Sequence, residues 1–142
     1  MTAMKRARKP AAGFRIKRVY EPIAADDGVR VLVDRLWPRG LAKDKARIDQ
    51  WLKDVAPSGA LRRRFHGNPA MWDEFVAAYS RELAHEPGLA AVATLRALVR
   101  QQPVTLLYAA RDETRNNAVA LKKWLERKNR APSQPLKAPD KT

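Results

Sequence analysis

Three short segments of the chain have the alternation or the apolar content of β-strands. Apolar and charged side chains alternate over residues 16–20, which is typical of a strand with one buried face. A β-branched run over residues 29–33 follows the turn-like sequence at 26–28 and predicts a second strand. Residues 104–108 are almost wholly apolar, as in strands of parallel sheets that are covered on both faces. We therefore predict three strands, with the third at the centre of the sheet.

Helical patterns fill the long segment between the second and third strands. The apolar positions of residues 46–55 follow the spacing i, i+3, i+4, i+7 of one helix face: Ile48, Trp51, Leu52 and Val55. This spacing predicts a helix over residues 46–55. Ser58 has the side chain of an N-cap and predicts a short helix that runs to Arg64.

Two longer helices and a final one follow from capping residues and apolar stripes. Asn68 and Pro69 are typical of an N-cap and a first helical position, and the apolar stripe that follows ends at Pro87 and Gly88. A second stripe covers residues 89–99, and a last helix is expected from about 114 to 126. This order of elements predicts a single α/β domain with a small, partly parallel sheet flanked by helices.

The positive charge of the chain lies mainly at its two ends. The 142 residues include 29 Lys and Arg against 15 Asp and Glu, a formal net charge of +14. Twelve of these net charges fall within residues 1–18 and 122–142, so the central part is nearly neutral. We predict a flexible basic arm over 1–13, a folded domain over 14–128, and a disordered, basic, Pro-containing tail over 129–142.

Several classes of protein are excluded or disfavoured by composition. The absence of Cys excludes disulfides, Cys-ligated metals and thiol nucleophiles, and two His residues leave little for a metal site or a Ser-His-Asp triad. We therefore expect no metal and no cofactor. No apolar stretch has the length of a signal sequence or of a membrane span, so we expect a cytoplasmic protein without membrane contact.

Two charged segments, 34–41 and 109–117, each follow directly after a predicted buried strand. Ligands of open α/β sheets bind beyond the carboxyl ends of the strands, so these segments form one site if the two strands are parallel neighbours. The second segment also leads into a helix N-terminus, which favours an anion. The site would then combine carboxylates, guanidiniums and amides: Asp34, Arg35, Arg39, Arg111, Asp112, Asn116 and Asn117.

Each candidate side chain has a functional and a structural interpretation. Asp34 and Asp112 are candidate catalytic acids or bases, with an ion pair or a helix cap as the alternative. Arg35 and Arg39 are candidate clamps for phosphate or carboxylate, with salt bridges as the alternative. Trp37 either stacks on a planar ligand or closes the edge of the core.

The remaining candidates lie in the second segment and in the helical region. Arg111 is a candidate ligand contact, and Asn116 and Asn117 either bind a ligand edge or bond the facing backbone. Ser58 is interpreted as a cap, because no base is adjacent in sequence. His66 is interpreted as a loop histidine without a catalytic role.

The chain resembles the YeaO-like family, domain of unknown function 488, over about residues 14–126. The resemblance rests on the Asp-Arg-Leu-Trp-Pro-Arg-Gly motif at 34–40, on Trp51-Leu52 and Ala56-Pro57-Ser58, and on the Asp112-Glu113 and Asn116-Asn117-Ala118 sequences. It implies a small bacterial-type cytoplasmic α/β protein and no particular reaction. Arg115 departs from the family pattern, in which a His commonly precedes the Asn pair.

Three functions are consistent with these features. The first is a small α/β protein that binds or acts on an anionic small molecule at residues 34–41 and 109–117. The second is a nucleic-acid-associated protein that uses its basic ends for non-specific phosphate contacts. The third is a non-catalytic scaffold or a subunit of an oligomer. The first is favoured over the second because the central part lacks the interleaved basic and aromatic residues of a single-strand binder.

Overall fold

A parallel sheet of four strands organises the computed structural model, which describes residues 13–65 and 68–130. The strands are β2 (Phe14–Arg18), β3 (Val29–Leu32), β4 (Gln50–Trp51) and β5 (Val104–Tyr108), in the order β2-β5-β3-β4. All three pairings are parallel, and Leu106 at the centre of β5 lies beside Ile16 on one side and Val31 on the other. The predicted α/β class is confirmed, and so is the central position of the third predicted strand.

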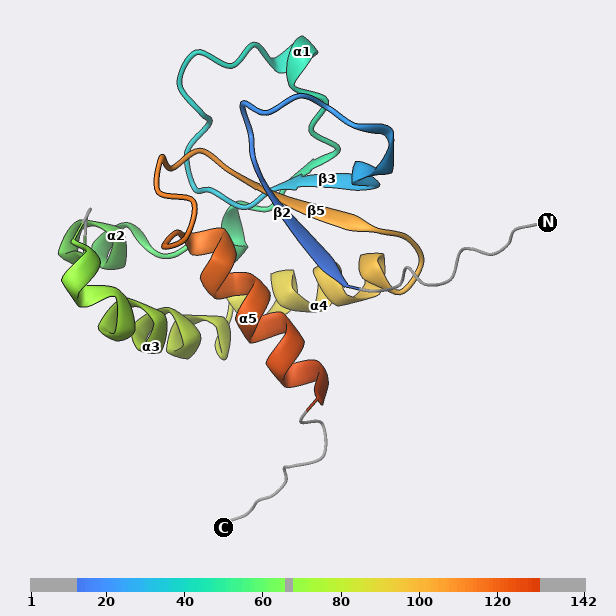
Figure 1. Ribbon diagram of the computed structural model, residues 1–142. Coiled ribbons are helices and arrows are strands. Elements are labelled where there is room, and N and C mark those ends of the chain that lie inside the picture. The colour runs from blue at the N-terminus through green and yellow to red at the C-terminus, as the bar shows by residue number, and fades with distance from the viewer. Residues whose placement is uncertain (1–12, 66–67, 131–142) are drawn as a thin grey trace.

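Helices cover the sheet unequally on its two faces. Figure 1 shows α4 (Gly88–Val99) and α5 (Asn117–Arg130) on one side and the short α1 (Lys43–Ala46) on the other. Helices α2 (Gly59–Phe65) and α3 (Trp72–Leu83) extend the helical side. Three short 3-10 helices complete the described elements: η2 (Ala25–Asp27), η3 (Lys53–Val55) and η4 (Pro69–Met71). The helices predicted after Ser58, after Asn68 and after Pro87 are therefore confirmed.

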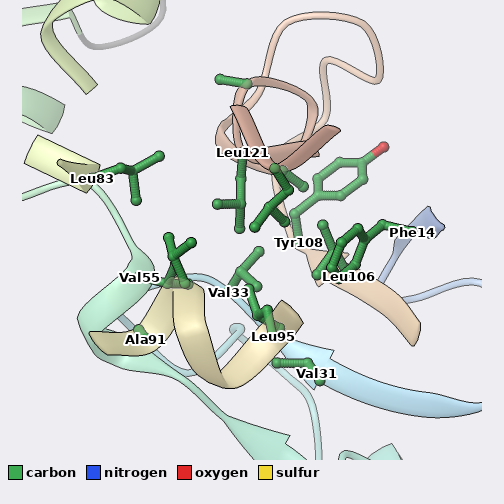
Figure 2. Packing of buried hydrophobic residues seen from close by; sticks show 14 of the residues in the cluster. Phe14, Val31, Val33, Val55, Leu83, Ala91, Leu95, Leu106, Tyr108 and Leu121 are labelled. Atoms are coloured by element: carbon green, nitrogen blue, oxygen red, sulfur yellow. The ribbon is translucent and has the colours of Figure 1, made fainter. Parts of the chain in front are cut away.

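Alternation along the strands sends side chains into two different cores. Val31, Leu106 and Tyr108 face the helices and belong to the main cluster, in which Figure 2 shows side chains from the sheet and helices pointing toward one another. Leu32 and Leu107 point to the opposite face, where a smaller cluster packs beneath loops instead of long helices. The sheet is thus buried on both faces, as the apolar content of β5 predicts.

The helix predicted over residues 46–55 is wrong. Arg47 adopts a left-handed conformation with φ 52° and ends α1. The Asp49 N–H then donates to the Arg30 carbonyl at 2.8 Å, and β4 pairs with β3 as an edge strand. The apolar side chains that suggested one helix face divide between the two cores: Ile48 and Trp51 join the smaller cluster, and Leu52 and Val55 the main one. Four apolar positions at helical spacing also fit a short edge strand with flanking turns, so the spacing alone does not distinguish a helix from this arrangement.

Polar residues are buried on the loop-covered face near the amino end of β3. Asp27 is 3% exposed and Arg30 is 4% exposed, and their side chains form an ion pair. Lys17 Nζ donates to Asp27 Oδ1 at 3.0 Å, and Thr105 Oγ1 donates to the Asp27 carbonyl at 2.7 Å. This network ties β2, β3 and β5 together, and the alternating pattern gave no sign of it.

Some sequence predictions fall outside the described residues. These are the predicted arm and tail, apart from their innermost residues, and His66. Within the described ranges, no helix has the length and apolar character to cross a membrane.

Candidate functional site

The carboxyl ends of β2, β3 and β5 meet along one edge of the sheet, and a cleft of about 1220 Å³ opens there. Both predicted segments line it, which confirms that β3 and β5 are parallel neighbours and bring the two loops together. Residues from β2, α2 and α3 form the rest of its wall. All eight residues predicted for the site line this cleft: Asp34, Arg35, Trp37, Arg39, Arg111, Asp112, Asn116 and Asn117.

Asp34 joins the two loops by hydrogen bonds from its side chain. Asp34 Oδ2 accepts from the Ala109 N–H at 3.0 Å, and Oδ1 accepts from Asn117 Nδ2 at 3.1 Å. The same Asn117 Nδ2 donates to the Val33 carbonyl at 3.0 Å. Burial raises the pKa of the Asp34 carboxyl, although these donors and the positive charge of Arg62 act in the opposite direction. Asp34 therefore fixes the geometry of the cleft at the junction of β3, β5 and α5.

Arg35 and Trp37 are held by backbone carbonyls next to the cleft. Arg35 Nε donates to the Pro57 carbonyl at 3.1 Å, and another guanidinium nitrogen donates to the Ala56 carbonyl at 3.2 Å. Trp37 Nε1 donates to the Leu41 carbonyl at 2.7 Å, and its ring meets Trp51 edge to face at 5.4 Å. The Trp37 contacts favour its structural interpretation, whereas Arg35 bonds backbone carbonyls and forms none of the salt bridges considered for it within the described residues.

Asp112 organises the turn that leads into α5. Its Oδ1 accepts from the Thr114 N–H and the Arg115 N–H, both at 2.9 Å, and these bonds lower the pKa of the exposed carboxyl. Asn116 is 5% exposed; its Oδ1 accepts from the Val119 N–H at 2.9 Å and its Nδ2 donates to the Asp112 carbonyl at 2.9 Å. Asn116 thus has the contacts of an N-cap, and α5 begins at Asn117, three residues later than predicted.

Arg39 and Arg111 are the cleft arginines whose charge is least engaged. Both are exposed, and within residues 13–65 and 68–130 no ion pair or hydrogen bond involves either guanidinium. Arg39 lies in the loop after β3 and Arg111 in the loop after β5, and the Asp34 hydrogen bonds connect these two loops. Their side chains are free to bind an anion at the mouth of the cleft.

Strand β2 and the turn after it contribute two residues that sequence reasoning missed, Arg18 and Tyr20. Arg18 Nε donates to the Ala110 carbonyl at 2.9 Å, and its guanidinium lies 4.9 Å from the centre of the Tyr20 ring. The Tyr20 hydroxyl donates to the Arg39 carbonyl at 2.7 Å, which links the end of β2 to the loop after β3. The first predicted strand also belongs to the sheet, so the rule that ligands bind beyond strand carboxyl ends could have identified these two residues.

The helical wall of the cleft is aromatic. Phe65, Trp72 and Phe75 line it, and the Trp72 and Phe75 rings are stacked with centroids 5.6 Å apart and planes at 23°. Phe65 meets Phe75 edge to face at 6.1 Å. The sequence pattern assigned Trp72 and Phe75 to a core-facing stripe, and both are indeed half-buried against the main core.

A smaller cavity of about 600 Å³ lies between α2, α3 and the start of α4. Ser58 Oγ lies there, accepts from the Leu61 N–H at 3.1 Å and donates to Glu82 Oε2 at 2.7 Å. Ser58 is therefore the cap that the sequence predicts. Across the part of the chain that the structure describes, no group of three or more acidic or His side chains is arranged to hold a metal ion.

Comparisons with known proteins identify relatives of the whole domain. The sequence matches the family DUF488-N3i, described as the inactive DUF488-N3 subclade, over residues 13–139. It is 44% identical over 110 residues to the uncharacterised protein YeaO of Escherichia coli, covering 77% of this chain and 93% of that protein. It is 48% identical over 111 residues to an uncharacterised protein of Mycobacterium bovis, covering 78% of this chain and 92% of that protein. No solved structure matches the chain.

Proposed function

The chain belongs to the DUF488-N3i family, the inactive DUF488-N3 subclade, and from this premise we propose that it is a cytoplasmic protein whose cleft binds an anionic small molecule without transforming it. The resemblance to the YeaO-like family is confirmed by the match to YeaO itself. This subclade is described as inactive, which supports binding over catalysis. The ligand would lie between the loops after β3 and β5.

The observation that carries this proposal is the pair of unengaged guanidiniums at the mouth of the cleft. Six arginines line the cleft and only two carboxylates, Asp34 and Asp112, accompany them. None of the six guanidiniums forms an ion pair in the described chain, and those of Arg39 and Arg111 also make no hydrogen bond there, unlike those of Arg18 and Arg35. The charges of Arg62 and Arg115 act on the Asp34 and Asp112 carboxyls. Guanidinium groups bind phosphate and carboxylate oxygens through charge-assisted hydrogen bonds, so an anion supplies the missing partner.

The contacts of the two carboxylates also support binding without turnover. Both oxygens of Asp34 accept hydrogen bonds that hold the loops together, and Asp112 Oδ1 accepts from the turn before α5. A general base needs an oxygen directed at the substrate, and both oxygens of Asp34 are directed at a backbone N–H and an amide of the protein itself. The catalytic roles considered for Asp34 and Asp112 stay predictions.

Calorimetric titration of the full chain with inorganic phosphate at low salt tests the proposal. We expect saturable binding that weakens about tenfold in Arg39→Ala and again in Arg111→Ala, because each removes a charge-assisted contact. Arg63→Ala is the matched control, since Arg63 is exposed on α2 and lines neither cavity. Equal phosphate affinity in all three variants would show that the cleft is not the anion site.

A second candidate function rests on the twelve net charges of residues 1–18 and 122–142. If these ends bind nucleic acid, affinity for duplex DNA should fall steeply when salt rises from about 50 to about 200 mM, because released counterions drive such binding. Removing residues 1–12 and 131–142, which carry five of these twelve net charges, should weaken the binding. A trimmed chain that binds DNA as tightly as the full chain contradicts this alternative.

A further inference from the structure

The cleft has two chemically different walls. The strand-end loops supply Arg39, Arg111 and Arg115, whereas the α2–α3 side supplies the ring cluster of Phe65, Trp72 and Phe75. Inorganic phosphate would use only the first wall. A ligand that uses both must carry an anionic group and a flat apolar group on one small molecule.

Trp72 has an unused donor on the aromatic wall. Its indole N–H makes no hydrogen bond within the described residues, whereas Trp37 donates to the Leu41 carbonyl and Trp51 to the Asp34 carbonyl. The Trp72 ring is half-buried and already stacks on Phe75 on one side. Buried or interfacial Trp side chains usually pair this N–H, so an acceptor on a bound ring is a suitable partner.

The positive charge extends from the loops to the aromatic wall. Arg62 on α2 is exposed, lines the cleft, and lies close enough for its charge to lower the pKa of the Asp34 carboxyl against the effect of burial. Arg62 therefore adds positive charge to the α2 side of the cleft, in the same helix as Phe65. At about 1220 Å³ the cleft also has room for much more than a lone phosphate, since pockets for small organic ligands occupy roughly 300–1000 Å³.

We propose that the anion bound here is a nucleotide, with its phosphate at Arg39 and Arg111 and its base against Trp72. This inference rests on the proposed function and adds the chemical class of its ligand. Stacking on an aromatic side chain is tolerant of base identity because every base has a π face, and the Trp72 N–H adds a hydrogen bond to a ring acceptor. We assign a free nucleotide and not a nucleic acid strand, because the cleft is bounded by α2, α3 and the two strand-end loops.

Titrations with adenosine monophosphate and ribose 5-phosphate separate the two walls. We expect the full chain to bind adenosine monophosphate about tenfold more tightly, the effect of one stacked base. Trp72→Leu should remove this preference and leave ribose 5-phosphate affinity within about twofold, while Arg39→Ala should weaken both ligands alike. Trp124→Leu is the matched control, because Trp124 also packs against the main core but does not line the cleft.

Two further measurements keep the test independent of the stability of Trp72→Leu. Trp72→Phe retains a ring and should keep most of the preference for adenosine monophosphate. In the wild-type chain, the indole N–H signal of Trp72 should shift in a nitrogen–proton correlation spectrum with adenosine monophosphate and stay in place with ribose 5-phosphate.

The outcomes distinguish this inference from the function on which it rests. Equal affinity for the two phosphates, still dependent on Arg39, would overturn the nucleotide assignment and leave anion binding intact. If neither adenosine monophosphate nor ribose 5-phosphate binds, both the nucleotide assignment and the proposed anion binding are overturned. Tighter binding of a single-stranded oligonucleotide, lost in Trp72→Leu, would overturn the assignment to a free nucleotide.

Discussion

The two ends of strand β3 each carry an acidic side chain in a polar setting, but the settings differ in one respect. At the amino end, Asp27 meets two cations, Lys17 and Arg30, beneath the loops that cover the sheet. At the carboxyl end, Asp34 meets only uncharged donors, the Ala109 N–H and the Asn117 amide, beside an open cleft. The arginines nearest the cleft mouth are left for other partners. Charge is thus neutralised internally at one end of the sheet and available to a ligand at the other.

The pKa values of the two carboxyls move in opposite directions for this reason. Burial alone raises the pKa of either carboxyl, because it disfavours the charged form. At Asp27 the Ala24 N–H, Lys17 and Arg30 outweigh burial and lower the pKa. At Asp34 the two neutral donors do not, and the pKa is raised. At Asp27 two cations add to a backbone donor, whereas at Asp34 the neutral donors and the more distant charge of Arg62 do not offset burial.

The same substitution at both positions should separate the two ends by its effect on stability. Asp27→Asn leaves Lys17 and Arg30 without their buried counterion, and breaking a buried ion pair from one side costs about 3 to 5 kcal/mol. We expect a loss of this size in the free energy of unfolding measured by urea denaturation. Asp26→Asn is the control, since Asp26 pairs with Arg15 at the surface and such pairs contribute about 0 to 1 kcal/mol. A loss below about 1 kcal/mol in Asp27→Asn would mean that the network does not hold the amino end together.

Asp34→Asn should destabilise the protein less. The new amide turns its NH₂ group toward either the Ala109 N–H or the Asn117 amide, so one hydrogen bond is lost and two donors face each other. Losing one hydrogen bond to a half-buried carboxylate costs about 1.5 to 3 kcal/mol, less than breaking the buried ion pair of Asp27. Urea denaturation again measures the change. A loss as large as that of Asp27→Asn would show that the two carboxylates contribute equally to the free energy of unfolding.

The pH dependence of the two losses should have opposite signs. The folded pKa of Asp27 lies below its ordinary value of 3.8, so its stabilising effect is present above that value and is lost as pH falls through the folded pKa. The folded pKa of Asp34 lies above 3.8, so the folded protein holds this proton more tightly than the unfolded chain. Its stabilising effect is greatest below 3.8 and declines as pH rises through the folded pKa. As pH rises from acid to neutral, the loss of unfolding free energy caused by Asp27→Asn should grow and the loss caused by Asp34→Asn should shrink. If both losses changed in the same direction, the two ends of β3 would not differ in this way.

The fold was largely predictable because its main elements have strong local signals. The β-branched run of β3, the apolar β5 and the capping residues Ser58 and Asn68 each act within a few residues. Sequence reasoning failed at residues 46–55, where a left-handed Arg47 and pairing with β3 override a helical spacing. Both causes depend on a partner strand about twenty residues away, which a local pattern does not contain.

The candidate site was predictable from topology only in part. The two strand-end loops followed from the rule for parallel sheets, and the structure brings them into one cleft. The aromatic wall was missed because Trp72 and Phe75 fit a core stripe, and half-burial lets one ring serve both the core and the cleft. The network of Asp27 and Arg30 was missed because charged residues within a few positions of each other give no sign of burial.

The smallest effect on stability should come from the two arginines on which the proposed anion binding depends. Arg39→Ala and Arg111→Ala remove exposed guanidiniums that contact nothing charged in the described chain, so each should change the free energy of unfolding by less than about 0.5 kcal/mol. In excess anion these two substitutions should affect stability more, because a ligand that binds only the folded state stabilises it in proportion to the logarithm of its affinity. The wild-type chain should then gain stability in phosphate, and these two variants should gain less. Equal gains would place the anion elsewhere, and a large loss without ligand would mean that the arginines belong to the fold, as Arg30 does at the opposite end of the strand.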